Sequence, residues 1–416
     1  MNKSINSDFL NIMNERGFIH QITDKEKLDQ ELSKNSMVGY IGFDCTASSL
    51  HVGSLIQIMM LRWFQKTGHK PIVLMGGGTT KIGDPSGKDN ARPLLTTDSI
   101  KENQTSIKTV FEKFLKFGSS KNDALMVDNS EWLDKLNYIS FLRDFGSSFS
   151  INKLLNLESV KQRLDREQNL SFLEFNYSLL QAFDFLQLNK VYDCKMQMGG
   201  SDQWGNIVTG LDLIRKKTSK RSFGFTSPLL TTNSGAKMGK TANGAVWLNE
   251  EQLSDWNFWQ YWRNTEDLDV IKFLKLFTEI PITEINKLEQ LKGAEINEAK
   301  IVLANEVTKL CHGEKASIQA FNTATDTFEK GKLGDKLPKY FITLSKDNNV
   351  SLIDALCKSE LCKSKGEARR LIRGGGAKIN DISYLEENYL INKNHFDKSG
   401  SIKISSGKKN HAVLYI

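Results

Sequence analysis

A histidine stands in a polar turn between a predicted strand and a predicted helix. The segment runs from Tyr40 to Ser54, with His51 and Gly53 near its end. Such a turn leaves backbone N–H groups unpaired at the positive end of a helix dipole, which suits a nucleotide phosphate. His51, expected in the first turn of that helix, could donate to a phosphate oxygen, and Gly53 would let an adenine lie against the backbone. A lone His-x-Gly triplet is more often an ordinary surface histidine.

Two lysines three residues apart form a second candidate group, nearly two hundred residues later. Lys237 and Lys240 lie in a stretch rich in small residues, from Gly235 to Thr241. Lysines placed this way can reach one triphosphate and neutralise its developing negative charge. By itself the stretch could be any exposed loop. Together with the histidine turn, it resembles the two signatures of class I aminoacyl-tRNA synthetases.

A third candidate stretch, from Gly76 to Lys88, is rich in glycine. Lys88 does not follow the Gly-x4-Gly spacing of a Walker motif, so that interpretation is rejected. Glycine backbone here permits close approach to a ligand, and Asp84 offers a carboxylate to an ammonium group.

Polar residues that could recognise a substrate recur at helical spacing. Tyr177, Gln181 and Asp184 are four and three residues apart, so they share one face of a helix otherwise rich in Leu and Phe. A buried polar stripe favours a polar ligand, although an exposed helix face remains the alternative. Further along, Asp202 and Gln203 lie where a strand joins another helix, and they could hold ribose hydroxyls and substrate.

Five motifs in this chain are similar to those of bacterial-type tyrosyl-tRNA synthetases and occur in the family's order. The resemblance covers nearly the whole chain. The motifs are Tyr40-x-Gly-Phe-Asp-x-Thr, Gly83-Asp-Pro-Ser-Gly-Lys, Leu180-Gln-Ala-Phe-Asp-Phe, Gly199-Gly-Ser-Asp-Gln-Trp-Gly-Asn and Lys237-Met-Gly-Lys-Thr.

The resemblance implies a tyrosine-binding set. Tyr40 and Asp184 would hydrogen-bond the phenol of the substrate. Its ammonium group would be held by Asp84, Tyr177 and Gln181. The α-amino and carboxylate end of the adenylate would be oriented by Asp44 and Gln203.

The resemblance also implies a nucleotide set. ATP contacts are expected from Gly42, His51, Gly53, Ser54, Gly200, Asp202, Met238 and Lys240, of which Gly42, Gly200 and Asp202 would contact the ribose. Catalytic groups at the phosphates are expected to be Thr46, His51, Lys88, Arg92, Lys237, Lys240 and Thr241.

Two positions depart from the family pattern. Ser54 stands where the family commonly has a second histidine, so the contact there is weaker or differently made. Ile41 stands where many members carry a cysteine beside the ribose, which removes one possible hydrogen bond. Neither departure concerns tyrosine recognition.

The fold class expected is α/β. Strand-like runs alternate with helical patterns, as in a Rossmann-like, doubly wound parallel sheet. These runs are Val38 to Phe43, Pro71 to Met75, Ala124 to Val127 and Lys195 to Met198. The apolar helical segment from Tyr138 to Leu186 exceeds what a crossover needs, and we interpret it as an insertion that carries a subunit interface.

The expected organisation has four parts. Residues 1–230 form the catalytic domain, with the helical dimerisation insertion at about 130–190. Residues 231–330 carry the lysine signature and an α-helical domain, residues 331–347 form a linker, and residues 348–416 form a small α+β RNA-binding module.

The C-terminal region concentrates positive charge. From Asn348 to Ile416 there are twelve Lys and Arg against seven Asp and Glu, in a chain whose net charge is +7. Ser364 is a predicted N-cap for a helix closed by three glycines. The expected tRNA contacts on that helix are Lys365, Arg369, Arg370 and Arg373. The segment from Ser351 to Asn380 is similar to the small RNA-binding module at the end of bacterial tyrosyl enzymes, and a basic solvated face is the alternative.

Composition excludes several classes of protein. No apolar run approaches the roughly 20 residues that cross a bilayer, and no signal pattern opens the chain. Five cysteines without CxxC pairing favour neither a disulfide framework nor a zinc site, so a cytoplasmic protein is expected.

The function expected is tyrosine–tRNA ligase, acting in two steps. L-tyrosine reacts with ATP to give tyrosyl-adenylate, and the tyrosyl group then passes to the terminal adenosine of tRNA(Tyr). ATP is a substrate, Mg²⁺ is expected with it, and neither a tightly bound cofactor nor a dedicated metal site is expected. A homodimer without membrane contact is expected. The alternatives are a tryptophan-activating relative and a noncatalytic RNA-binding or splicing factor.

Overall fold

A computed structural model describes most of the chain. The described residues are 5–86, 95–233, 235, 238–241, 244–328, 337–345, 348–397, 399–407 and 410–416, with backbone only at 240 and 241. The chain forms two compact units. The first comprises Met1–Ser254 and Tyr261–His312, and the second comprises Asp255–Gln260 and Gly313–Ile416.

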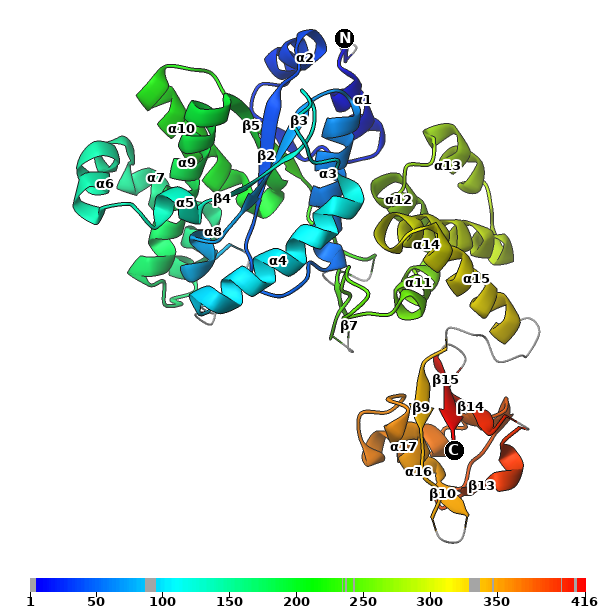
Figure 1. The fold of residues 1–416 in the computed structure, drawn as a ribbon. Coiled ribbons are helices and arrows are strands. Elements are labelled where there is room, and N and C mark those ends of the chain that lie inside the picture. The colour runs from blue at the N-terminus through cyan, green and yellow to red at the C-terminus, as the bar shows by residue number, and fades with distance from the viewer. Residues whose placement is uncertain are drawn as a thin grey trace. The chain divides into compact units, whose positions relative to one another are not determined.

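A six-stranded sheet forms the centre of the first unit (Figure 1). Its strands lie in the order β1-β6-β5-β2-β3-β4, all parallel except β1, which pairs antiparallel with β6. The strands are β1 (Gln21–Ile22), β2 (Val38–Phe43), β3 (Lys70–Met75), β4 (Leu125–Asp128), β5 (Cys194–Gly200) and β6 (Phe223–Ser227). The predicted doubly wound parallel sheet is confirmed. Its strand order reverses between β2 and β5, where ligands bind in such folds.

Helices cover both faces of this sheet (Figure 1). The helices that precede the insertion are α1 (Asp8–Glu15), α2 (Lys25–Lys34), α3 (Leu55–Lys66) and α4 (Thr97–Phe114). Those that follow β4 are α5 (Ser130–Leu133), α6 (Tyr138–Phe145), α7 (Ile151–Leu155), α8 (Glu158–Asp165), α9 (Phe172–Tyr192) and α10 (Trp204–Thr218). Short 3-10 turns are η1 (Val52–Ser54), η2 (Thr79–Lys81), η3 (Gly146–Ser148) and η4 (Ser201–Gln203).

The side chains of β2 alternate between the two faces of the sheet, and each face packs against a different helix. Tyr40 belongs to the hydrophobic cluster that includes Phe183 and Phe185 of α9. Its neighbour Gly39 faces the other side, where an added Cβ would lie 3.1 Å from the Phe64 ring of α3. Successive strand residues point to opposite faces, so one residue of β2 packs under α9 while the next packs under α3.

Within the insertion, α8 is tied to α9 by a buried ion pair. Arg163 lies 2.7 Å from Glu174, and both side chains are almost fully buried. Glu174 also completes a capping box with Ser171, which begins α9. The predicted helical character between Tyr138 and Leu186 is confirmed by α6 to α9.

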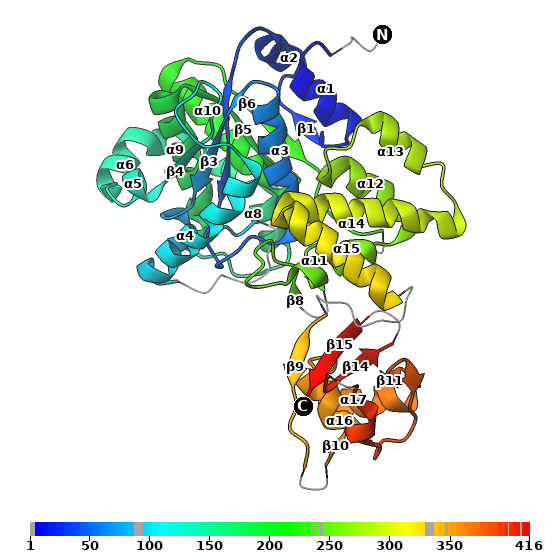
Figure 2. The same ribbon diagram turned by 45° about the vertical axis from the view of Figure 1, so that its right-hand side comes forward.

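Further helices complete the first unit. They are the end of α11 (Asp255–Arg263), α12 (Asp267–Phe277), α13 (Ile282–Leu288), the turn η5 (Gly293–Glu295) and α14 (Ile296–His312). Helix α12 packs on α3 and α14, and α14 also packs on α4 (Figure 2). Between α10 and α11, a small hairpin pairs β7 (Lys240–Thr241) with β8 (Gly244–Ala245).

The second unit contains a small α+β module after α15 (Glu314–Phe328). Its helices are α16 (Leu352–Lys358) and α17 (Lys365–Arg373), with a short turn η6 (Lys393–His395). Its five-stranded sheet has the order β12-β11-β14-β15-β9, and β10 pairs separately with β13. These strands are β9 (Lys339–Phe341), β10 (Asn349–Ser351), β11 (Ala377–Ile379), β12 (Ile382–Ser383), β13 (Leu390–Asn392), β14 (Ser401–Ser406) and β15 (Asn410–Tyr415).

The module's sheet extends into the range expected for the linker. Strand β9 pairs in parallel with β15, so Lys339–Phe341 belong to the module although they fall within residues 331–347. Strand β9 lies at the edge of the sheet, and its three residues are exposed or half-buried. The alternation between its two faces is therefore too weak for the sequence to predict a strand. Among the described residues, every helix is too short or too polar to span a bilayer.

Candidate active site at the carboxyl ends of the strands

Tyr40 and Asp184 are buried polar groups beneath the switch point. The Tyr40 hydroxyl has no hydrogen-bond partner among the described residues. The Asp184 carboxyl, on α9, is 2% exposed. Burial raises the pKa of Asp184 to about 8. Burial, and then the charge of Asp184, raise the pKa of Tyr40 well above its usual range. A tyrosine hydroxyl buried without a partner is costly unless a ligand satisfies it.

Two residues that the sequence did not identify hold the Asp184 carboxyl group. Asn129 Nδ2 donates to Asp184 Oδ2 at 2.9 Å, and Trp132 Nε1 donates to Oδ1 at 2.7 Å. Asn129 follows β4 directly, and Trp132 lies in the short helix α5 that comes next. The rule that a site lies past the ends of parallel strands could have found them, but their residue types carry no signal of their own.

Asn129 also holds the glycine-rich turn that follows β3. Its Oδ1 accepts from the Gly78 N–H at 2.7 Å, and its Nδ2 donates to Thr79 Oγ1 at 3.0 Å. Thr79 in turn donates to Asp44 Oδ1 at 3.0 Å. The glycine-rich turn, the end of β2 and α9 are therefore joined through one amide side chain.

The polar stripe on α9 faces the strand ends. The Tyr177 hydroxyl donates to the Asp44 carboxylate, 3.3 Å from each oxygen. Gln181 Nε2 donates to Gln203 Oε1 at 3.3 Å. Tyr177 is buried and Gln181 is half-buried, so an exposed helix face is excluded.

Asp84 and Gln203 form a second polar group beside the stripe. Gln203 Nε2 donates to Asp84 Oδ2 at 2.7 Å, and Asp84 Oδ1 accepts from the Ser86 N–H at 2.9 Å. Asn206, on α10, donates to the side-chain oxygens of Gln181 and Gln203, 3.2 Å from each. Asn206 was expected only as part of a motif. The structure thus brings together Asp44, Asp84, Tyr177, Gln181 and Gln203.

His51 caps the turn that precedes α3. The side chain stands just before η1 instead of in the first turn of a helix, which corrects the expected placement by one position. The reason is that His51 Nδ1 accepts from the Gly53 N–H at 2.9 Å, an interaction that an N-cap makes. An accepting Nδ1 places the proton of the neutral ring on Nε2, which is then the donor.

The lysine stretch is paired with the histidine turn. The Val52 N–H donates to Val246 O at 2.9 Å, and the Val246 N–H donates to Gly239 O at 3.0 Å. Gly239 has a φ of +91°, and a Cβ there would lie 2.8 Å from the Gly53 nitrogen. Only glycine fits this left-handed position so close to another backbone. The two signatures therefore meet, although nearly two hundred residues separate them.

The expected nucleotide residues that the structure describes belong to this junction or to the ends of β2 and β5. Met238 is buried, and its carbonyl oxygen would lie 3.2 Å from a Cβ on Gly53. Gly42 and Thr46 are exposed, and Ser54 makes no capping hydrogen bond to α3. Gly200 ends β5, where a Cβ would lie 2.5 Å from Asp202 Oδ1. Lys88, Arg92, Lys237 and the side chains of Lys240 and Thr241 lie outside the described residues.

A cavity of about 900 Å³ borders this site. Its lining includes Ser201 and Asp202 at the strand ends and the basic side chains Lys153, Arg215 and Lys220. The cavity lies beside the polar network described above, between the insertion and α10.

The basic helix of the C-terminal module has acidic partners. Helix α17 begins at the predicted N-cap Ser364, whose side chain accepts from the Glu367 N–H. Lys365 lies 2.8 Å from Asp354, and Arg369 and Arg373 both contact Glu387. The expected tRNA contacts are therefore partly neutralised, a feature invisible in the spacing of the basic residues.

Comparison with known proteins agrees with this geometry. A family model for class I tRNA synthetases (W and Y) matches residues 32–329. The tyrosine–tRNA ligase of Zymomonas mobilis subsp. mobilis is 59% identical over 408 residues, 98% of each chain. That of Brucella abortus is 54% identical over 409 residues, again 98% of each chain.

A solved structure gives the same result. The C-terminally truncated mitochondrial tyrosyl-tRNA synthetase of Aspergillus nidulans is 30% identical, with a TM-score of 0.69, over 77% of this chain and 94% of that chain. The chain therefore belongs to the class I tRNA synthetases of the tryptophan and tyrosine family and, within it, to the bacterial-type tyrosyl-tRNA synthetases.

Proposed function

We propose that the site activates L-tyrosine with ATP and then transfers the tyrosyl group to the terminal adenosine of tRNA(Tyr). The observation that carries the amino-acid specificity is the buried Tyr40 hydroxyl, which no described residue satisfies, next to the buried Asp184 carboxyl. A substrate phenol would supply the missing partner, whereas phenylalanine would leave the Tyr40 hydroxyl unpaired and bring no hydrogen-bonding group to Asp184. Discrimination of about 10⁵ on this basis is established for tyrosyl-tRNA synthetases themselves, the family to which this chain belongs.

The remaining polar groups would orient the reacting end of tyrosine. The carboxylates of Asp44 and Asp84 are held by Tyr177 and Gln203, so they keep fixed positions for an ammonium group. Positioning is the main requirement, because the tyrosine carboxylate is itself the nucleophile that attacks the α-phosphate. No side chain has to form a covalent bond.

The phosphate groups would be stabilised at the junction of the two signatures. The Nε2 of His51 is oriented as a donor by its capping bond. Lys237, Lys240 and Thr241, with Thr46, Lys88 and Arg92, would neutralise the charge that develops as pyrophosphate leaves. We propose that Mg²⁺ enters with ATP, because phosphate oxygens are the hard ligands that this ion prefers. Gly42, Gly200 and Asp202 would contact the ribose.

We also propose a homodimer formed through the insertion. Ile139 on α6 and Phe172 at the start of α9 are each 69% exposed, an unusual state for large apolar side chains. Other exposed apolar residues of the insertion are Tyr138, Leu142, Ile151, Leu155, Leu164 and Leu173. So many exposed apolar side chains in one segment favour an interaction surface. The proposed partners are thus tRNA(Tyr), L-tyrosine, ATP and a second copy of the chain, in the cytoplasm.

The alternatives are less well supported. Relatives more than 50% identical over 98% of this chain are tyrosine–tRNA ligases, which favours neither a tryptophan-activating enzyme nor a noncatalytic RNA-binding protein.

ATP–pyrophosphate exchange tests the proposal directly. The wild-type protein should exchange with tyrosine and not with tryptophan or phenylalanine. Tyr40→Phe and Asp184→Asn should each weaken the preference for tyrosine over phenylalanine more than they weaken ATP binding. Exchange driven by tryptophan, or by no amino acid, would overturn the proposed function. An unchanged tyrosine preference in both variants would overturn the assignment of the phenol pair.

A further inference from the structure

The residues before the lysine signature are held by helix α12. The Asp269 carboxylate is 3% exposed, and its Oδ2 accepts from the Asn233 N–H at 2.8 Å. One turn later, Lys272 Nζ donates to Thr231 O at 2.9 Å. A buried carboxylate bound to a backbone N–H makes a strong, charge-assisted contact. Two side chains of one helix thus hold a donor and an acceptor of the same short backbone segment.

The other side of the lysine signature is held as well. The Gly239 backbone forms a hydrogen bond with Tyr261, at the end of α11, and burial raises the pKa of that hydroxyl to about 12. His312 Nε2 lies 3.1 Å from Leu248 O, and the Leu248 N–H donates to Leu50 O. Described backbone contacts therefore hold the chain at residues 231–233, at 239 and at 248.

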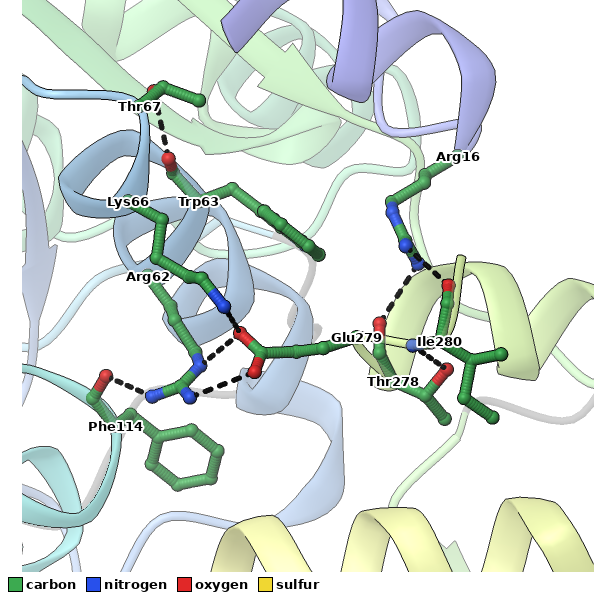
Figure 3. Close-up of polar contacts among 9 residues, drawn as sticks. All are labelled: Arg16, Arg62, Trp63, Lys66, Thr67, Phe114, Thr278, Glu279 and Ile280. Atoms are coloured by element: carbon green, nitrogen blue, oxygen red, sulfur yellow. Dashed lines mark hydrogen bonds and ion pairs between the residues drawn. The ribbon is translucent and has the colours of Figure 1, made fainter. Parts of the chain in front are cut away.

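The far end of α12 is fixed to the helix that begins at the histidine turn (Figure 3). Glu279, just past α12, accepts from Arg62 Nε at 2.7 Å and from Arg62 Nη2 at 3.1 Å. Lys66 donates to the same carboxylate at 2.8 Å. Burial would raise the pKa of Glu279, but hydrogen bonds and charge from Arg62 and Lys66 lower it below its usual value.

The carbonyl groups at that end are held too (Figure 3). Arg16 donates to Thr278 O at 2.9 Å and to Ile280 O at 2.7 Å, and its guanidinium lies 4.6 Å from the Trp63 ring centroid. Arg62 and Trp63 belong to α3, which starts one turn after His51. Helix α12 is therefore fastened at one end to α3 and at the other end to residues 231–233.

These contacts give α12 a function in the reaction. We propose that Asp269, assisted by Lys272, is a positioning residue that holds residues 231–233, which lead into the lysine signature, in a fixed place relative to α3 and the histidine turn. The inference rests on the proposed function, because it assigns the lysines to the leaving phosphates. Charges act on a transition state only when they are held close to their productive geometry, and side chains on rigid elements achieve that best.

Substitutions on α12 test this role. Asp269→Ala removes the acceptor, Asp269→Asn keeps an oxygen acceptor without the charge, and Lys272→Met removes the second contact. Matched controls lie on the same helix. Asp267→Asn changes a carboxylate that pairs with Lys300, and Lys275→Met changes a lysine near Glu289.

The measurement is the single-turnover rate of tyrosyl-adenylate formation at saturating tyrosine and ATP. Asp269→Ala should slow this step about tenfold or more, as expected for a lost charge-assisted contact. Asp269→Asn should be affected less. The dissociation constant for tyrosine should stay within about twofold of the wild type, and both controls should behave as the wild type.

Repeating the substitution without the signature lysines separates positioning from general damage. In a Lys237→Ala/Lys240→Ala background, Asp269→Ala should change the rate by less than about twofold, because the groups it positions are gone. Equal slowing in both backgrounds, or a tyrosine affinity that falls in step with the rate, would overturn the inference. If Asp269→Ala fails to fold, Asp269→Asn and Lys272→Met decide the question by the same comparison. Absence of tyrosine-dependent adenylate formation in the wild type would instead refute the proposed function.

Discussion

The side-chain amide of Asn129 donates a hydrogen bond of 2.9 Å to the Asp184 carboxyl group while its carbonyl oxygen holds the Gly78 N–H. One residue therefore fixes both the carboxyl group proposed to bind the substrate phenol and the glycine-rich turn above it. Its contribution lies in orientation, because Asn129 need not touch the substrate.

Asn129→Ala should reduce the preference for tyrosine over phenylalanine. A buried acceptor left without its donor costs about 1–3 kcal/mol, so the preference should fall by about 5- to 150-fold. Pyrophosphate exchange with each amino acid measures the effect. Asn176→Ala is the control, because Asn176 is half-buried on the same helix and its side-chain amide donates to the Phe172 carbonyl one turn away. A wild-type preference in Asn129→Ala would contradict the orienting role.

Asp184 should make the free enzyme less stable as pH rises. Its pKa is about 8 in the folded protein and close to 4 when unfolded. Between these values the folded state holds a proton that the unfolded chain has released, so the free energy of unfolding decreases with increasing pH. The slope due to this group is at most about 1.4 kcal/mol per pH unit.

Urea unfolding of the wild type and Asp184→Asn at several pH values from 5 to 8 tests this. The variant lacks the titrating group, so its stability should depend less on pH, and the difference from the wild type should grow towards pH 8. Parallel pH profiles would show that Asp184 is ionised throughout.

Lys237→Ala and Lys240→Ala should lower the rate of adenylate formation far more than the affinity for tyrosine. Charge that acts on a leaving pyrophosphate contributes in the transition state, not in the binding of the amino acid. Stopped-flow kinetics separates the two quantities. Lys108→Ala, at an exposed i,i+4 pair on α4, should have no effect. Proportional losses of rate and tyrosine affinity would argue against this role.

Ile139→Asp should convert a homodimer into a monomer. A charge placed within the proposed apolar contact would have no partner there, whereas Ile382→Asp, at a similarly exposed position of the C-terminal module, should leave the dimer intact. Light scattering at micromolar concentration gives the mass. A monomeric wild type would refute the dimer outright.

Deleting the chain after about residue 334 should leave tyrosine-dependent exchange nearly intact and abolish charging of tRNA. The residues proposed for adenylation all belong to the first unit, and the C-terminal module has its own core. A truncated protein that charges tRNA at the full-length rate would assign the module a role other than RNA binding.

Glu387→Gln provides a milder test of the same module. Glu387 contacts Arg369 and Arg373, so its removal should free positive charge, tighten tRNA binding and steepen its salt dependence. The matched variant Glu386→Gln, next to it in the sequence, should change both quantities less.

The sequence predicts the elements of the fold better than the partners within the site. Strand β2 has the predicted bounds, because a run of apolar residues with turn signals on both sides leaves few alternatives. Strand β1 was not predicted, since two residues carry no periodicity. Strand β6 was not predicted either, and its place between β1 and β5 is known only from the sheet order.

Within the site, spacing along one helix predicted which side chains share a face. Contacts between residues of different elements could not be predicted from the sequence. Tyr177, Gln181 and Asp184 share a face because the α-helix repeats every 3.6 residues. Asn129 and Trp132 reach Asp184 from another strand end, and Glu387 reaches Arg373 from a loop. Such pairs depend on tertiary packing, which no local pattern contains.

The pairing of the two signatures has a consequence for biosynthesis. Ser49 Oγ accepts from the Asn249 N–H across 200 residues of sequence. Contacts of such long range form late and slowly, and a chain grows on the ribosome at about 5–20 residues per second. Residues 246–249, whose backbone completes the histidine turn, are therefore synthesised many seconds after it. A chain released before residue 246 would carry the central sheet and the tyrosine-recognising side chains, but only half of its nucleotide face. Premature termination should thus yield an inert fragment and not one that consumes ATP.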